Sequence, residues 1–350
     1  MAHAQLFAGA EGALNLPLAL ACATYIHCEN KGDHDSCGTC AACSKNNKYI
    51  HPDTHFVFPL SNVKGEKDEE RLKAEILKAW RAFLLEQPFG NLNDWTNFYG
   101  GEDKQALISR EESREIIKTL SLKPFESHYK TMIIWQPELM HPSAANGILK
   151  ILEEPQPQTF FFLVTNAADK LLPTIISRTQ IVTVPLLDDE VIESHLIVQR
   201  NVDRSKAARI TQTAEGNINY ALSLIESEED DHTEYFTDWM RACFIKNYPS
   251  LVQMAEEYHA LDRLSQKNLI TYSMNAMRET LLSKYGATQM NRSQGKELEF
   301  IQRFSEKMDL EKIEKSFTLM NDANYHLERN GSAKMIFLDL SLKLAMTINP

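Results

Sequence analysis

Short apolar runs alternate with amphipathic stretches along the first half of the chain. Thr159–Val164 is apolar without alternation, which is typical of a parallel strand covered on both faces. Strands that alternate with helices predict βαβ units and a parallel sheet. The predicted strands are Gln5–Ala8, His55–Phe58, Thr131–Trp135, Thr159–Val164 and Gln180–Val184. The predicted helices are Leu14–His27, Glu66–Glu86, one capped by Ser109 and Glu112 and ending near Leu120, and one capped by Ser143 and stopped by Pro155.

The strand patterns end at Val184, and the rest of the chain reads as helical. Residues 188–225 predict a small helical unit. The stretch 226–234 has six carboxylates in nine residues without Lys or Arg, which predicts a solvated linker. Residues 235–350 predict helices with breaks at Gly286 and Gly331. We therefore predict three domains: an α/β domain over 1–186, a small helical domain over 187–228 and a larger all-α domain over 229–350.

The charge balance limits what the chain can bind. Its 350 residues include 48 Asp and Glu against 37 Lys and Arg, for a net charge of −11. An acidic chain is poorly suited to gripping nucleic acid over a broad basic face. The sequence has no apolar run of the length that a transmembrane helix needs, and its start lacks the basic region of a secretory signal. We expect a cytoplasmic protein without a membrane partner.

Four cysteines are spaced C-x8-C-x2-C-x2-C. Cys-x-x-Cys pairs place two thiolates on one tight turn, and four thiolates close a tetrahedral zinc site without leaving a position for substrate. We therefore predict a structural Zn²⁺ site. Two disulfides are the alternative, which a reducing compartment disfavours, and His27 and His34 are competing ligands. The predicted ligands are Cys28, Cys37, Cys40 and Cys43.

A phosphate-binding loop without its working residues follows the first predicted strand. The active pattern is G-x-x-x-x-G-K-[ST], and Gly9 and Gly12 stand in this chain with Leu14, Asn15 and Leu16 at the second glycine, lysine and hydroxyl positions. Asn15 has no charge and is too short to reach a β- or γ-phosphate, and Leu16 cannot bind Mg²⁺. We predict that ATP does not bind here. An ordinary βα turn would explain the glycines equally well.

Three further segments follow the cysteine module in a fixed order: Leu149–Pro155, Ser177–Gln180 and Ala214–Leu224. With them the chain resembles the clamp-loader branch of the AAA+ ATPases, and most closely the bacterial DNA polymerase III subunits. The resemblance implies an AAA+ α/β/α domain with a five-stranded parallel sheet and an inserted zinc module at 28–43. A small helical lid domain and a C-terminal helical collar for oligomerisation would follow. The motifs cover residues 3 to about 225, and the expectation of a collar beyond them is based on helical content and length alone.

The resemblance also shows what has been lost and what remains. Trp135 and Gln136 stand where working members have the Asp-Glu pair for Mg²⁺ and water, and Asn219 stands where an arginine reads the γ-phosphate. Arg178 matches the arginine that reaches a neighbouring subunit's ATP, so the resemblance implies an arginine finger in trans. The alternative is that Arg178 pairs with a local carboxylate.

These matches imply a non-catalytic stator in the clamp loader of the DNA polymerase III holoenzyme, which has DNA-directed DNA polymerase activity. The implied partners are the gamma/tau ATPase subunits and the delta subunit, with the sliding clamp and primer-template DNA reached indirectly. One alternative is an active ATPase with an atypical P-loop. Another is a zinc-dependent nucleic-acid-binding module, which Lys31, Lys45 and Lys48 near the cysteines support only weakly. Phe89–Gly101 is interpreted as a surface excursion.

Overall fold

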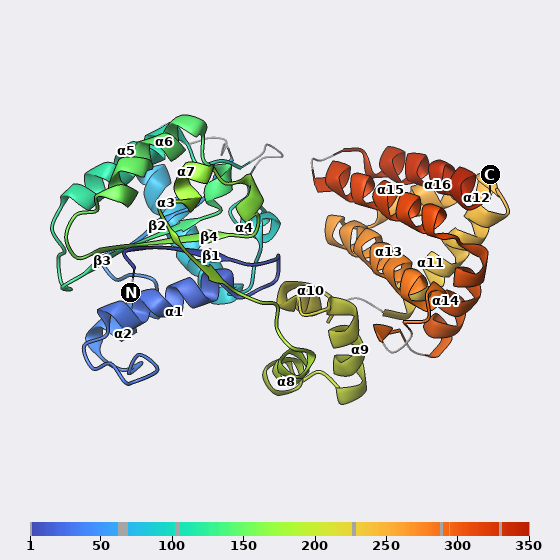
Figure 1. Cartoon of the computed structure of the whole chain (residues 1–350), viewed down its shortest axis with the longest axis horizontal. Helices are drawn as coiled ribbons and strands as arrows, with labels where there is room; N and C mark the ends of the chain where they lie inside the picture. The colour runs from blue at the N-terminus through green and yellow to red at the C-terminus, as the bar shows by residue number, and fades with distance from the viewer. Residues whose placement is uncertain are drawn as a thin grey trace. The chain divides into compact units, whose positions relative to one another are not determined.

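The computed structural model describes residues 2–61, 69–101, 106–225, 229–287, 290–293, 295–328 and 331–349. Contacts divide the chain into two compact units (Figure 1). The α/β unit comprises residues 1–188 together with 216–219, and the helical unit comprises 189–215 and 220–350. None of the helices found in the described residues combines the length and the apolar character that crossing a membrane requires.

The predicted five-stranded parallel sheet is confirmed. Its strand order is β2-β3-β4-β1-β5, so β3, β4 and β1 are interior strands and β2 and β5 form the edges. The register places Ala8 of β1 beside Thr165 of β4 and Thr183 of β5, so these strands end at the same edge of the sheet. The bounds are β1 Ala4–Ala8, β2 Thr54–Val57, β3 Lys130–Trp135, β4 Thr159–Thr165 and β5 Gln180–Thr183.

Helices cover both faces of the sheet, as the unbroken apolar run of β4 predicts. Phe161 and Leu163 of β4 point to the face covered by α5, α6 and α7. Phe162 and Val164 point to the opposite face, where α1, α3 and α4 pack. The bounds are α1 Asn15–His27, α2 Ala41–Asn46, α3 Glu69–Glu86, α4 Leu92–Phe98, α5 Arg110–Ser121, α6 Pro142–Glu153 and α7 Pro173–Ile176, with 3-10 turns η1 Pro137–Leu139 and η2 Ala168–Lys170.

The helical unit is built around aromatic side chains. Phe337 of α16 stacks on Trp239 of α11 and on Tyr258 of α12, with ring centroids 4.5 and 4.4 Å away. All three are fully buried, so this stack joins the first and last helices of the region 229–349. The bounds are α8 Asp189–Arg200, α9 Arg204–Ala214, α10 Ile218–Ser223, α11 Glu229–Phe244, α12 Tyr248–Ala260, α13 Arg263–Lys284, α14 Gly295–Lys307, α15 Leu310–Glu328 and α16 Ala333–Ile348.

Three local predictions were wrong. The cap of α6 is His141, whose side chain accepts from the backbone N–H of Ser143, and Pro142 at the first helical position has no backbone N–H that would need an acceptor. The acidic stretch does not form an extended linker throughout, because α11 begins at Glu229, while 226–228 lie outside the described residues. The segment 89–101 is not a surface excursion: it contains α4, and its Trp95 is fully buried.

Candidate functional site

Asn15 stands where an active phosphate loop has its lysine, and its side chain is buried at the first position of α1. Its amide nitrogen donates to the backbone oxygens of Gly9 and Thr165 at 3.1 and 3.0 Å. The same nitrogen lies 3.0 Å from the side-chain oxygen of Asn166. The residue therefore ties the β1–α1 loop (residues 9–14) to the end of β4 instead of facing a ligand.

Neighbouring side chains fill most of the space beside the β1–α1 loop. Gly12 has a φ of 85°, and a Cβ there would overlap the side chain of Asn217. Leu16, at the Mg²⁺-ligand position, is buried in the core beneath α1. A cavity of about 30 Å³ remains between the loop, Trp135 and residues 88–91. This is about the volume of one water molecule, whereas small-molecule pockets hold roughly 300–1,000 Å³.

An aromatic cluster occupies the end of β3, where the resemblance places the metal-binding carboxylates. Trp135 is 3% exposed, and its ring lies 5.1 Å from that of Trp80 of α3. Trp80 in turn stacks on Phe58 at 4.3 Å and meets Trp95 of α4 edge-on at 5.0 Å. Gln136 adopts a left-handed backbone with a φ of 57°, and its backbone N–H donates to Val164. These two side chains provide no carboxylate for Mg²⁺.

Two polar residues that were not predicted from the sequence, Asn91 and Asp94, lie over the β1–α1 loop. They cap α4 reciprocally: the Asn91 side chain accepts from Asp94, and the Asp94 carboxylate accepts from Asn91. Asn91 also donates to the carboxylate of Glu11 at 2.9 Å. Asn219, at the sensor-arginine position, donates to Asp94 at 2.8 Å. The three-residue spacing of a helix cap was the available sequence signal.

Arg178 lies in the turn between α7 and β5. Its guanidinium donates through two nitrogens to one carboxylate oxygen of Glu153, at 3.1 and 2.9 Å, and through a third to the backbone oxygen of Thr174. The arginine side chain is 30% exposed. Arg178 precedes β5 whereas the β1–α1 loop follows β1, so in a parallel sheet the two lie at opposite strand ends. Arg178 is thus remote from the β1–α1 loop of its own chain. It also pairs with a local carboxylate, that of Glu153, as the alternative interpretation expects.

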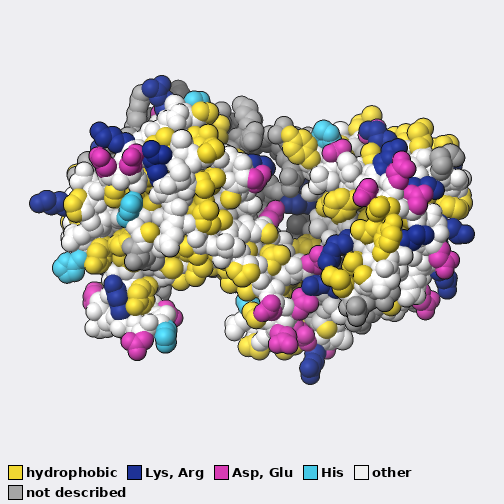
Figure 2. Space-filling view, viewed as in Figure 1, with side chains coloured by type: hydrophobic (Ala, Val, Ile, Leu, Met, Phe, Trp, Pro, Cys, Tyr) yellow, Lys and Arg dark blue, Asp and Glu magenta, His cyan; other side chains and the backbone are white. Residues whose placement is uncertain are grey.

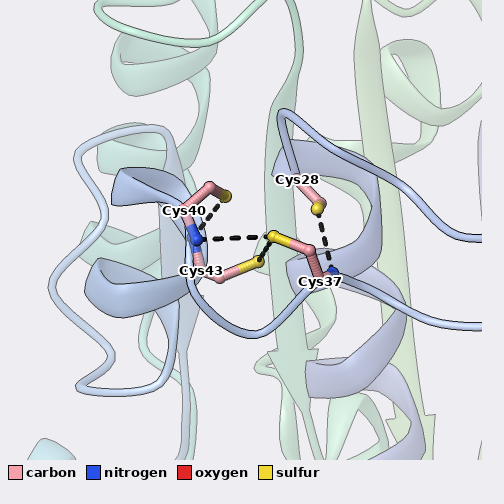
Figure 3. A group of neighbouring side chains, drawn as sticks. All are labelled: Cys28, Cys37, Cys40 and Cys43. Atoms are coloured by element: carbon pink, nitrogen blue, oxygen red, sulfur yellow. Dashed lines mark hydrogen bonds between the residues drawn. The ribbon is translucent and has the colours of Figure 1, made fainter.

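The four predicted cysteine ligands come together at the end of α1 and the start of α2 (Figure 3). All four sulfur atoms lie within 4.8 Å of one another, and those of Cys37 and Cys43 are 4.0 Å apart. A tetrahedral site with Zn–S bonds of about 2.3 Å has sulfur–sulfur edges of about 3.8 Å. Gly38, with a φ of 72°, allows the tight turn. All six cysteines of the chain are free thiols, so the disulfide alternative is not realised.

Backbone hydrogen bonds surround these sulfurs. The N–H groups of Cys37, Cys40 and Cys43 donate to the sulfurs of Cys28, Cys37 and Cys40, respectively. Such donors, from Thr39 first and then Cys40, lower the pKa of the Cys37 thiol to about 6. Burial raises the pKa of the Cys43 thiol to about 12. The set combines a readily formed thiolate with a buried thiol that a cation would have to deprotonate.

The two competing histidines lie outside this group. His34 is exposed in the loop before Cys37. His27 is buried, stacks on His51 at 4.3 Å and contacts the hydroxyl of Thr131 at 3.0 Å. Burial, reinforced by His51, lowers the pKa of His27 to about 3, so it is neutral at pH 7. His27 therefore belongs to the packing between α1 and the sheet.

Asp53 connects the start of β2 to the loop that precedes β3, which also contacts α2. Its buried carboxylate accepts three backbone N–H groups, from Phe125, Glu126 and Ser127, at 2.6 to 2.8 Å. Burial alone raises the pKa of Asp53, but these bonds outweigh it, and the net pKa is lowered. Lys45 of α2 also forms an ion pair with Glu126 at 2.5 Å. The module is thereby fixed to the loop that precedes β3.

Charged side chains of both signs are interspersed over the face shown in Figure 2. On this face, the described residues show no continuous basic stripe of the kind that tracks a nucleic-acid backbone. This face therefore gives no further support to nucleic-acid binding beyond the three lysines near the cysteines.

Comparisons with known proteins place these features in a family. The model of a family described as "DNA polymerase III, delta subunit" matches residues 1–188. The DNA polymerase III subunit delta′ of Bacillus subtilis (strain 168) is 30% identical over 254 residues, which are 72% of this chain and 60% of that protein.

Two further similarities cover most of the chain. The DNA polymerase III subunit delta′ of Haemophilus influenzae is 23% identical over 69% of this chain. The match spans 60% of the length of each of these delta′ relatives. Among solved structures, a DNA polymerase III gamma subunit-related protein from Thermotoga maritima is 15% identical, with a TM-score of 0.37 and coverage of 98% of this chain and 96% of that chain.

Proposed function

The chain belongs to the DNA polymerase III delta-subunit family, and from this membership we propose that it is a delta′-like, non-catalytic stator subunit of a clamp loader. Its role is to support ATP-driven loading of the sliding clamp during DNA replication. The gamma/tau ATPase subunits and a delta subunit are its proposed partners, and it reaches the clamp and primer-template DNA through them. The chain would act in the cytoplasm, as part of the DNA polymerase III holoenzyme.

The observation that carries the proposal is the occupied phosphate loop. The Asn15 amide donates to the protein's own backbone oxygens, the buried Trp135 stands where the resemblance places the metal-binding carboxylates, and a cavity of about 30 Å³ remains beside them. A nucleotide needs an open loop, a cation and a pocket at least tenfold larger. We therefore propose that the chain binds no ATP. Titration of the full chain with Mg-ATP tests this directly, and tight binding would favour the alternative of an active ATPase.

We propose that Arg178 acts as an arginine finger for the ATP of an adjacent subunit. Its place away from its own β1–α1 loop supports action in trans, and its partial exposure leaves the guanidinium accessible. The pairing with Glu153 is compatible with this role because half-exposed ion pairs are worth only about 0–1 kcal/mol. A phosphate group of a neighbouring subunit can outcompete such a pair, since phosphate carries more charge and accepts bidentate bonds.

The finger is tested in a reconstituted loader with clamp and primed DNA. Arg178→Ala is expected to lower turnover at the site it faces by about 10³–10⁵, and Arg178→Lys is expected to rescue little because lysine lacks the planar fork. Arg204→Ala is the matched control. Arg204 is the first residue of α9, its side chain is 88% exposed, and it lies 3.9 Å from the carboxylate of Glu193 on α8. Unchanged ATPase activity in Arg178→Ala refutes the finger and leaves the stator role to be judged by complex assembly.

The cysteine group is proposed to hold a structural Zn²⁺. Cys28, Cys37, Cys40 and Cys43 would bind it as thiolates, and the ion would supply a cross-link between the end of α1 and α2. No catalytic role follows, because four sulfurs leave no coordination position free. Metal analysis of the reduced chain is the test, and the absence of zinc at a stoichiometry near one contradicts this part of the proposal.

A further inference from the structure

The segment Pro88–Tyr99 is held firmly above the β1–α1 loop. Trp95 of α4 is fully buried in the aromatic cluster, and its indole N–H donates to the backbone oxygen of Pro59 at 2.9 Å. Tyr99 contacts the hydroxyl of Ser61 at 2.9 Å. Because α4 is anchored at these points, the residues just before it have a fixed position. Four of them, residues 88–91, line the small cavity at the loop.

Polar contacts extend from this segment in two directions. Asn91 donates to Glu11 of the β1–α1 loop at 2.9 Å and lies 3.3 Å from the side-chain oxygen of Asn219. Asn219 donates in turn to Asp94 at 2.8 Å. The segment 216–219, which contains the first two residues of α10, also contacts the loop directly, because the N–H of Ile218 lies 3.4 Å from the oxygen of Gly12. The loop, the start of α4 and this segment thus form one closed network within the α/β unit.

We infer that the segment 88–99 takes the place of a bound nucleotide in this chain, joining the β1–α1 loop to the segment 216–219 whether or not nucleotide is present. This rests on the proposed function of a subunit that binds no ATP. In phosphate-binding loops, the anion's contacts with backbone N–H groups order the loop and its neighbours. Here the bonds come from within the chain and have another chemistry: Asn91 donates to the side chain of Glu11 in the loop and to Asn219, and Asn219 donates to Asp94. The conformation of this region is therefore independent of nucleotide, which suits a fixed subunit.

Hydrogen exchange on the full chain tests the inference at the backbone amides of residues 9–16 and 216–219. Asn91→Ser keeps a side-chain oxygen to cap α4 but removes both bridging donors. Asn219→Ala removes the bond to Asp94 and leaves α4 intact. Each variant is expected to speed exchange in both segments about five-fold or more, the equivalent of about 1 kcal/mol at 1.4 kcal/mol per factor of ten. Asn93→Ala, an exposed position on α4, is the control and is expected to exchange like the unaltered chain.

The outcomes separate this inference from the proposed function. Faster exchange in both variants, with no effect of Mg-ATP on any of the chains, supports the inference. Unchanged exchange in either variant overturns it while leaving the non-catalytic role standing. Slower exchange of the unaltered chain on adding Mg-ATP shows that the loop still takes nucleotide and overturns the proposed function as well. Tryptophan fluorescence of each variant verifies that it is folded.

Discussion

Asn15→Ala is the sharpest test of how the β1–α1 loop is stabilised. The side-chain amide has two hydrogens and faces three oxygens at 3.0 to 3.1 Å, so it makes about two full hydrogen bonds at once. At about 1 kcal/mol per bond, with a further cost for leaving buried carbonyls unpaired, the loss is about 2–3 kcal/mol. The better helix propensity of alanine offsets at most about 0.7 kcal/mol. We expect a net destabilisation of the α/β unit by about 2 kcal/mol.

Urea unfolding followed by tryptophan fluorescence measures this loss. Three of the four tryptophans, Trp80, Trp95 and Trp135, lie in the α/β unit, so the signal reports mainly on that unit. Asn15→Asp is the second variant: it keeps the volume but turns an oxygen toward three oxygens, and it is expected to cost at least as much as alanine. Asn97→Ala, exposed on α4, is the control within about 0.5 kcal/mol. A fully stable Asn15→Asp chain would refute the hydrogen-bonding argument.

Three further predictions concern other parts of the α/β unit. Cys43→Ser is expected to abolish stoichiometric zinc in metal analysis and to lower the unfolding midpoint; retention of the metal would contradict a four-cysteine site. Glu153→Gln, which frees Arg178, is expected to change stability by less than about 1 kcal/mol and to leave reconstituted ATPase activity at or above its normal level; a loss as large as that of Arg178→Ala would instead make the pair a required positioning contact. The pKa of Asp53 is lowered, so the stability that its carboxylate contributes is complete above the ordinary pKa of 3.8 and is lost as the pH falls through the lowered value. Asp53→Asn is therefore expected to lower the free energy of unfolding at pH 7 and to reduce the pH dependence of unfolding below pH 4. An unchanged pH dependence below pH 4 would count against this assignment.

The strands and the position of the loop could be predicted because their signals are local. The run Thr159–Val164 is apolar without alternation, so both faces of that strand are apolar. The glycines Gly9 and Gly12 lie directly between a strand and a helix. The cysteine group was equally visible, since Cys-x-x-Cys spacing alone brings sulfurs together. Each of these predictions depends on residues within a few positions of one another.

The contacts that cover the loop could not be predicted because they join distant segments. Asn91 and Glu11 are 80 positions apart, and Asn219 and Asp94 are 125 apart. The burial of Trp95 in the segment 89–101 depends on Trp80, which lies on a different helix. The ion pair of Arg178 with Glu153 likewise depends on how α6 and α7 pack. Sequence spacing contains no record of such pairings.

The packing of Trp135 at the end of β3 limits which side chains this site can accept. Trp135→Asp alone would place an unpaired carboxylate among Trp80 and its aromatic neighbours, at a cost of several kcal/mol. Asn15→Lys alone would bury a charge against backbone oxygens with no phosphate to receive it. Each of these single substitutions thus gives a less stable protein. Engineering a nucleotide site here would therefore require changing the loop, β3 and α4 together.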